Sequence, residues 1–134
     1  MKIYLAYKYK QIKDKPTHEK TLLAIADKIT VLNNKVFLLG RDVQKWGSVE
    51  LTHTGLLSTI MKNIKKSDTL FAYINSNVFS FGLAFEFVWA TIFGKKIIVA
   101  VEDGVKAPLF SALAAKKISF KDSKDLIEKL PEFL

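Results

Sequence analysis

Apolar residues follow two alternating periods along this chain. Short runs in which nearly every residue is apolar are typical of strands covered on both faces, and they occur at residues 2–6, 36–39, 69–74, 97–101 and, more weakly, 117–120. Apolar positions three and four residues apart predict helices between these runs, at residues 17–32, 56–66, 80–93 and 123–130. Strands that alternate with helices predict an α/β fold, a three-layer sandwich with a five-stranded parallel sheet of flavodoxin-like or Rossmann-like type.

The expected strand order 2-1-3-4-5 predicts where a ligand would bind. Parallel sheets of this kind bind ligands at the carboxyl ends of the strands, where the strand order reverses. The reversal would lie between the first and third strands, bordered by the loops at residues 6–10 and 75–80. A helix that begins near Ser80 therefore starts where chemistry is expected.

The length of 134 residues suits one domain, residues 1–134, that is large enough to bury a core. The chain has no cysteine, which excludes disulfides and thiolate chemistry. Its first residues are too short an apolar run for a signal peptide. Residues 78–94 fall short of a membrane span and carry Glu86 near their centre. We therefore expect a cytoplasmic protein without a membrane partner.

The formal net charge of +8 comes almost entirely from lysine, and Arg41 is the only arginine. Arginine is the side chain that forks onto phosphates and base edges, so its scarcity argues against nucleic acid as a partner. A solvated lysine surface, or attraction of a small phosphorylated ligand, fits the charge better.

Glu86 lies in an almost wholly apolar stretch, residues 80–94. Burying an ionised carboxylate without a partner is costly, so the stretch indicates a pocket in which Glu86 performs chemistry. Gly82 lies four residues earlier on the same helix face and would let a ligand approach the backbone. Ser80, at the helix start, is either an anion-binding hydroxyl or a plain N-cap.

These residues carry a resemblance to a known family. The pattern Ser80-x-Gly82-x-x-x-Glu86, followed by Ala90 and by Gly94-Lys-Lys-Ile-Ile-Val, resembles the nucleoside 2-deoxyribosyltransferase superfamily. This group includes the 2'-deoxynucleoside 5'-phosphate N-hydrolases and related nucleotide N-glycosidases. The likeness covers most of the chain, including the first strand and residues 64–72.

The resemblance implies cleavage of the bond between a nucleobase and its sugar. Glu86 would attack the anomeric carbon, and water or a second base would resolve the covalent glycosyl-enzyme. Tyr4 would lie beside this carboxylate, and Ser80 would hold a 5'-phosphate. The resemblance further implies a homodimer or a larger homo-oligomer, in which a neighbouring subunit completes each pocket.

The chain departs from the family pattern in two places. Ile60 occupies the position of an acidic residue or asparagine, and residues 7–10 replace a glycine-rich loop. Asp42, Glu50 and His53 are candidates for the missing polar group. In the replaced loop and the long second connection, three aromatic residues would stack on a base, pack internally or meet a second subunit: Tyr7, Tyr9 and Trp46.

These sequence features are compatible with three functions. The first is an N-glycosidase or deoxyribosyltransferase acting on a small nucleoside or nucleotide. The second is a nucleotide-binding or sensing module without catalysis, favoured by Ile60. The third is a basic structural or nucleic-acid-associated protein of the same architecture. No cofactor is expected, because His18 and His53 lack metal-ligand spacing and no Gly-x-Gly-x-x-Gly or Walker-type loop is present.

Overall fold

The computed structural model describes residues 1–9 and 12–134, and its strands form one parallel sheet in the order β2-β1-β3-β4-β5. The predicted fold class and strand order are confirmed. The carboxyl ends of β1 and β3 lie side by side, with Tyr7 opposite Tyr73 in the register. The strands of the sheet are β1 (Lys2–Tyr7), β2 (Lys35–Phe37), β3 (Thr69–Ile74), β4 (Lys96–Glu102) and β5 (Lys116–Phe120).

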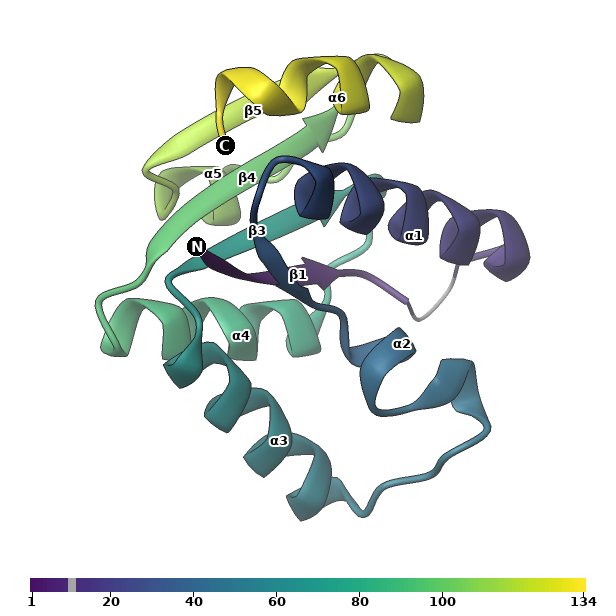
Figure 1. Ribbon diagram of the computed structural model, residues 1–134, viewed down its shortest axis with the longest axis vertical. Coiled ribbons are helices and arrows are strands. Elements are labelled where there is room, and N and C mark those ends of the chain that lie inside the picture. The colour runs from purple at the N-terminus through teal and green to yellow at the C-terminus, as the bar shows by residue number, and fades with distance from the viewer. Residues whose placement is uncertain (10–11) are drawn as a thin grey trace.

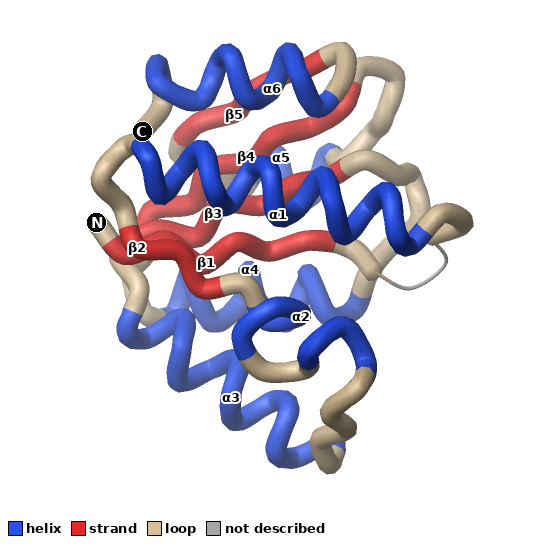
Figure 2. Tube along the Cα trace, turned by 45° about the vertical axis from the view of Figure 1, so that its right-hand side comes forward, coloured by secondary structure: helices blue, strands red, loops and turns tan. Residues whose placement is uncertain are grey.

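Helices cover both faces of the sheet (Figure 1, Figure 2). One face carries α1 (Lys15–Val31) and α6 (Ser123–Lys129), and the other carries α3 (His53–Lys66), α4 (Phe81–Ile92) and α5 (Pro108–Ala112). Three short elements complete the chain: α2 (Leu39–Asp42) and the 3-10 turns η1 (Lys45–Gly47) and η2 (Leu130–Glu132).

Alternate residues of β1 supply the two cores. Successive side chains of a strand point to opposite faces, so Ile3 and Leu5 pack under α1 and α6, whereas Tyr4 and Ala6 pack under α3 and α4. All four are fully buried. The first strand thereby places a hydroxyl-bearing ring in the layer that contains α4.

The first helix begins earlier than predicted and ends as predicted. Asp14 caps it by accepting a hydrogen bond from the backbone of Thr17, and Pro16 occupies its first turn, where a missing N–H costs nothing. Asn33, with φ of 67°, ends it in the left-handed region that asparagine tolerates.

The second strand ends two residues earlier than predicted. The Asp42 carboxylate accepts a hydrogen bond from the backbone of Leu38 at 2.9 Å, and the Tyr7 hydroxyl accepts one from the backbone of Gly40, also at 2.9 Å. These contacts turn the chain into α2 instead of extending the ladder. The helix α5 was likewise not predicted; Pro108 opens it, because proline suits a first helical turn.

The almost wholly apolar sequence of the helix that carries Glu86 is typical of a helix buried all round, but the structure buries only one side of it. Its outer face leaves Phe81 84% exposed, Ile92 62% and Val88 53%. Its ends match the prediction, since Ser80 caps it and Gly94 follows it with φ of 67°. Across residues 1–9 and 12–134, no helix combines the length and apolar character that a membrane crossing requires.

Candidate functional site

Glu86 is buried on the inner face of α4, with 7% of its surface exposed. Leu83, Phe87 and Ala90 are buried on the same helix. Removal from water raises the pKa of Glu86 to about 8, and the neighbouring Tyr4 hydroxyl opposes this rise only in part. The site therefore holds a carboxyl group that changes its protonation state just above neutral pH.

Tyr4 places a side-chain hydroxyl beside this carboxyl. Its ring is fully buried and packs on Phe37 with ring centres 5.2 Å apart. Burial, and then the negative charge of Glu86, raise the pKa of Tyr4 well above its usual value. Among the described residues, the Tyr4 hydroxyl forms no hydrogen bond of ordinary length and angle. The structure thus brings Tyr4 and Glu86 together, as predicted, with a buried hydroxyl that lacks a full partner.

Tyr7 lies at the end of the same strand, and its hydroxyl accepts the hydrogen bond from Gly40. Burial and the charge of Glu86, in that order, raise the pKa of Tyr7. The hydroxyls of Tyr4 and Tyr7 are therefore both within electrostatic reach of the same carboxyl.

Ser80 and Gly82 lie where α4 begins. The Ser80 hydroxyl accepts a hydrogen bond from the backbone of Leu83 at 3.2 Å, which is the plain N-cap arrangement. Gly82 is exposed, and a Cβ added there would contact only the Ser80 hydroxyl oxygen, at 3.9 Å. The backbone at Gly82 is therefore open to a ligand, and packing does not require glycine there.

Asp42 is engaged locally, in α2. Its carboxylate pairs with the Arg41 guanidinium at 2.7 Å and accepts the Leu38 backbone hydrogen bond at 2.9 Å. These contacts lower the pKa of Asp42, although partial burial works against them. Its role as a substrate contact remains a prediction.

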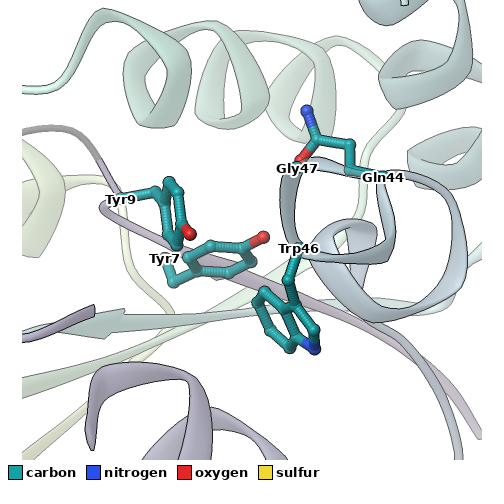
Figure 3. A pocket seen from close by; sticks show the side chains of 5 residues that line it. All are labelled: Tyr7, Tyr9, Gln44, Trp46 and Gly47. Atoms are coloured by element: carbon teal, nitrogen blue, oxygen red, sulfur yellow. The ribbon is translucent and has the colours of Figure 1, made fainter. Parts of the chain in front are cut away.

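An aromatic pocket opens next to Tyr7 (Figure 3). This pocket, hereafter the aromatic slot, has a volume of about 100 Å³ and is lined by Tyr7, Tyr9, Gln44, Trp46 and Gly47. The two tyrosines come from β1 and the residues after it, and the other three come from the turn around η1. The Tyr9 hydroxyl donates a hydrogen bond to Glu19 at 2.8 Å, which fixes one wall.

The opposite wall is held by an unusual backbone. Lys45, Trp46 and Gly47 have φ of 49°, 55° and 97°, so that three successive residues are left-handed. Gly40 makes this packing possible, because a Cβ there would overlap the Trp46 ring and lie 2.6 Å from the Tyr7 hydroxyl. Tyr7 and Trp46 were predicted from the sequence as aromatic candidates, whereas Gly40, which directly follows the second predicted strand, was missed.

Gln44 was also missed, and no feature of the sequence marks it, since it lies in an irregular connection of mixed composition. Glu50 and His53, considered for the missing polar group, are both exposed. Ile60 is 5% exposed and belongs to the same core cluster as Tyr4. An apolar side chain thus stands where the family pattern has a polar one.

Lys8 ties together the two loops that border the strand-order reversal. Its ammonium donates hydrogen bonds to the backbone carbonyls of Ser76, at 2.7 Å, and of Val78. Lys8 is buried, and burial lowers its pKa. It lines a second pocket, of about 240 Å³, together with Lys106 and an apolar wall that includes Phe79 and Phe110. Lys10, at the end of the predicted first loop, lies outside the described residues.

Comparisons with known proteins bear on the fold. No protein-family model matches the sequence, and no curated protein matches it either. The structure is similar to that of a CMP N-glycosidase, BcmB, from Clostridium botulinum, with a TM-score of 0.75 and 19% identity over all of both chains. It is similar to a 2-deoxyribosyltransferase from Bacillus psychrosaccharolyticus, with a TM-score of 0.68 and 22% identity over 95% of this chain and 90% of that one.

A conserved protein from Enterococcus faecalis V583 has a TM-score of 0.71 and 16% identity, over 99% of this chain and 98% of its own. At these identities the similarity establishes the fold. The fold that the resemblance implies is therefore confirmed.

Proposed function

We propose that this chain, which has the fold of a CMP N-glycosidase and of a 2-deoxyribosyltransferase, cleaves the N-glycosidic bond of a nucleoside or nucleoside 5'-monophosphate. The observation that carries the proposal is the buried Glu86 carboxyl beside the buried Tyr4 hydroxyl. A buried carboxyl with a strongly raised pKa is more typical of a functional site than of a structural one. The sequence pattern around Glu86 points to the same residue as nucleophile.

The proposed reaction has two displacement steps. An ionised Glu86 oxygen bonds to the anomeric carbon as the bond from that carbon to the base nitrogen breaks. The bonding electrons leave with the base, which takes up a proton. Water then attacks the same carbon, the ester bond to Glu86 breaks and the water loses a proton. A second base in place of the water would give transfer instead of hydrolysis.

The surroundings of Glu86 suit a step in which positive charge develops on the sugar. With a pKa of about 8, only about a tenth of Glu86 is ionised at pH 7. A cationic sugar ring favours the carboxylate, and so does the Tyr4 hydroxyl, which lowers the pKa of Glu86. The Tyr4 hydroxyl therefore stabilises the ionised form of Glu86, whereas the apolar surroundings favour its protonated, uncharged form.

Four further residues are proposed to contact the substrate. Ser80 and the free N–H groups at the start of α4 would hold a 5'-phosphate, with Lys8 and Lys106 adding positive potential nearby. Gly82 would leave room for the sugar, and Tyr7 would line its path to Glu86. The remaining contact, Asp42, would bind a sugar hydroxyl by giving up one of its hydrogen bonds to Arg41 or to the Leu38 backbone.

A second candidate is a nucleotide-binding module of the same fold without catalysis. It is favoured by Ile60, which is buried in the Tyr4 cluster where a polar group would support the sugar or proton transfer. Such a protein would keep the pocket and the phosphate contacts and bind a nucleotide, but it would not cleave the N-glycosidic bond.

The test is a substrate panel with a matched pair of variants. The purified protein, Glu86→Gln and Glu102→Gln are incubated with ribo- and deoxyribonucleosides and their 5'-monophosphates, and free base is measured by chromatography. Glu102 is a second partly buried carboxyl with a raised pKa, at the end of β4. The proposal expects base release by the wild type and Glu102→Gln, and a loss of at least about a thousandfold in Glu86→Gln.

No release from any compound, together with a rise in melting temperature on adding a monophosphate, would instead support the binding module. Release that persists in Glu86→Gln would remove Glu86 from the mechanism.

We also propose that residues 1–134 form a single domain that acts in the cytoplasm as a homodimer, through the exposed apolar face of α4.

A further inference from the structure

We infer that the aromatic slot binds the base of the substrate between Tyr9 and Trp46, and that it accepts a single six-membered ring, a pyrimidine, in preference to a fused purine. This inference rests on the proposed function and deepens it, since it names the class of base that the site takes. It is carried by the spacing of the rings, the size of the slot and the backbone that fixes Trp46.

The two walls have the spacing that a planar ring needs. The Tyr9 and Trp46 rings are 28° from parallel, with centres 6.5 Å apart. A ring stacked between two others needs about 7 Å, twice the contact distance of about 3.5 Å between carbon atoms. A widening of about half an ångström would therefore admit a base with both faces covered.

Tyr7 forms a third side. Its ring is nearly perpendicular to Tyr9, at 82° and 6.3 Å, and lies 6.4 Å from Trp46. The three ring centres thus form an almost equilateral triangle. Because the Tyr7 and Tyr9 rings meet edge to face, Tyr7 limits how far a flat ligand can extend into the slot in that direction.

The size of the slot favours one ring over two. Its volume is about 100 Å³, whereas a dry protein cavity of roughly 150 Å³ is known to hold one benzene molecule. The slot is open to solvent, so the substituents of a six-membered ring can project from it. A second fused ring would have to displace Tyr7 or leave part of its stacking surface uncovered.

Gln44 gives the slot a polar group on its rim. A carboxamide carries a donor and an acceptor side by side, and it can pair with a base edge that presents the complementary pair. The hydroxyls of Tyr7 and Tyr9 are engaged with Gly40 and Glu19. Gln44 is therefore the side chain of the slot that presents a donor and an acceptor side by side to the edge of a base.

The position of Trp46 is specified by its surroundings. A non-glycine residue with positive φ is disfavoured and persists where surrounding contacts over-determine it. Here two such residues, Lys45 and Trp46, are consecutive, and Gly40 gives up its side chain to admit the indole. This is the arrangement expected of a wall that must present its face to a ligand.

Tyr7 connects the slot to the proposed nucleophile. Its ring lines the slot, and the charge of Glu86 raises the pKa of its hydroxyl. Neither the slot nor the second pocket is lined by Glu86. Tyr7 and Trp46 pack against the core under α1 and α6, whereas α4 covers the other face of the sheet. A base in the slot would therefore have its sugar at the carboxyl end of β1, where the sugar must pass Tyr7 to reach Glu86.

The test reads binding separately from catalysis. Trp46 and Trp89 are the two tryptophans of the chain, so Trp89→Phe leaves Trp46 as the sole indole emitter. Fluorescence of this variant, with Glu86→Gln added to prevent turnover, is titrated with CMP, UMP, AMP and GMP. We expect quenching, with Kd at least about tenfold lower for the pyrimidine nucleotides, consistent with stacking energies of about 1–3 kcal/mol per base.

Two substitutions of Trp46 test the wall itself, with binding followed by calorimetry. Trp46→Leu is expected to weaken CMP and UMP binding at least about tenfold, whereas Trp46→Phe keeps an aromatic face and stays within about threefold. Retained binding by Trp46→Phe also shows that the turn folds without the indole. Trp46→Leu with unchanged affinity would overturn the inference, and so would equal affinity for purine and pyrimidine nucleotides.

The two proposals can fail independently. Release of purine and pyrimidine bases at equal rates, lost in Glu86→Gln, would keep the proposed function and overturn the pyrimidine preference. Selective pyrimidine binding that requires an aromatic residue at Trp46, without release of base from any compound, would keep the slot and remove the proposed catalysis.

Discussion

The chemistry of Glu86 is governed at the scale of single residues. Its carboxyl is removed from water on the inner face of α4, and Tyr4 is the side chain that opposes the resulting rise in pKa. A carboxyl in such surroundings is present in both protonation states near neutral pH. A pKa close to the working pH is the one at which a side chain acts most effectively as a catalytic acid or base. Two pH dependences follow.

The first concerns activity. If ionised Glu86 is the nucleophile, kcat/KM should rise with pH and level off above about pH 8, the pKa of the free protein. Tyr4→Phe removes the hydroxyl that lowers this pKa, so the midpoint should move to higher pH and the plateau should fall. A pH–rate profile of both proteins measures this. A profile that falls over the same range would assign Glu86 a proton-donating role instead.

The second concerns stability. The pKa of Glu86 is raised from 4.5 to about 8 in the folded state, so between these values the folded protein retains a proton that the unfolded chain has lost. The contribution of Glu86 to stability is therefore complete below about pH 4.5 and is lost as pH rises toward 8, by at most about 1.4 kcal/mol per unit.

Urea unfolding at several pH values checks this second dependence. Relative to the wild type, Glu86→Gln should gain stability progressively between pH 5 and pH 8, because glutamine cannot ionise. An identical pH dependence in the two proteins would contradict a buried, neutral Glu86.

Two glycines differ in the space around them: Gly40 is closely packed against side chains, whereas Gly82 is open to a ligand. Gly40→Ala places a methyl group against Trp46 and the Tyr7 hydroxyl, and should cost about 1–3 kcal/mol of stability. Gly82→Ala meets only open space near Ser80 and should leave thermal stability unchanged or slightly higher. If Gly82 leaves room for the sugar, KM should rise in Gly82→Ala. Equal melting temperatures for wild type and Gly40→Ala would contradict the close packing at Gly40.

At the scale of elements, the start of α4 combines a structural and a proposed binding role. Ser80 caps α4 and Thr52 caps α3 in the same way, with cap hydrogen bonds of 3.2 Å and 3.0 Å. Alanine at either position should cost about 1 kcal/mol of stability. Only Ser80→Ala should also raise KM for a nucleoside monophosphate relative to the unphosphorylated nucleoside. The ratio of the two KM values in both variants measures this.

Thr52→Ala serves as the matched control for helix capping. A phosphate preference that is unchanged in Ser80→Ala would leave Ser80 as a cap alone.

The short elements α2 and η1 also depend on hydrogen bonds to single side chains. Tyr7 and Asp42 bond the backbone of Gly40 and Leu38, and these bonds replace strand pairing by a turn that carries Trp46.

At the scale of the whole molecule, the outer face of α4 is the exposed apolar feature that a second subunit would cover. Phe81, Val88 and Ile92 lie on one side of the helix, at spacings of seven and four residues, and each is more than half exposed. Contiguous exposed apolar surface is typical of interaction sites. The face begins beside Gly82 and Ser80, so a partner there would adjoin the proposed phosphate contacts.

We therefore expect a dimer in light scattering coupled to size-exclusion chromatography, and a monomer for Val88→Lys. Val31→Lys is the matched control, because Val31 is 74% exposed at the end of α1, on the other side of the sheet. A wild-type monomer at micromolar concentration would contradict the proposal, and so would a Val31→Lys variant that dissociates equally.

Much of the fold was predictable because local sequence and tertiary context agree. The apolar runs at β3 and β4 are typical of strands covered on both faces. Ser80, as the N-cap, and Gly94, with its positive φ, mark the limits of α4. The prediction of β2 was wrong at its end, because side chains of Tyr7 and Asp42 compete for backbone groups that the local pattern assigns to a strand.

The sequence by itself determined the parallel sheet and the burial of Glu86, because periodicity and a lone carboxyl in an apolar run have few physical solutions. The strand order was expected from the flavodoxin-like type and is established by the structure. Only the tertiary structure decided that Tyr9, Gln44 and Trp46 surround one slot, and that Gly40 must be glycine to admit the indole. These residues lie on separate segments and depend on left-handed backbone at Lys45 and Trp46. Such contacts are absent from any local pattern, because they arise only when the segments pack together.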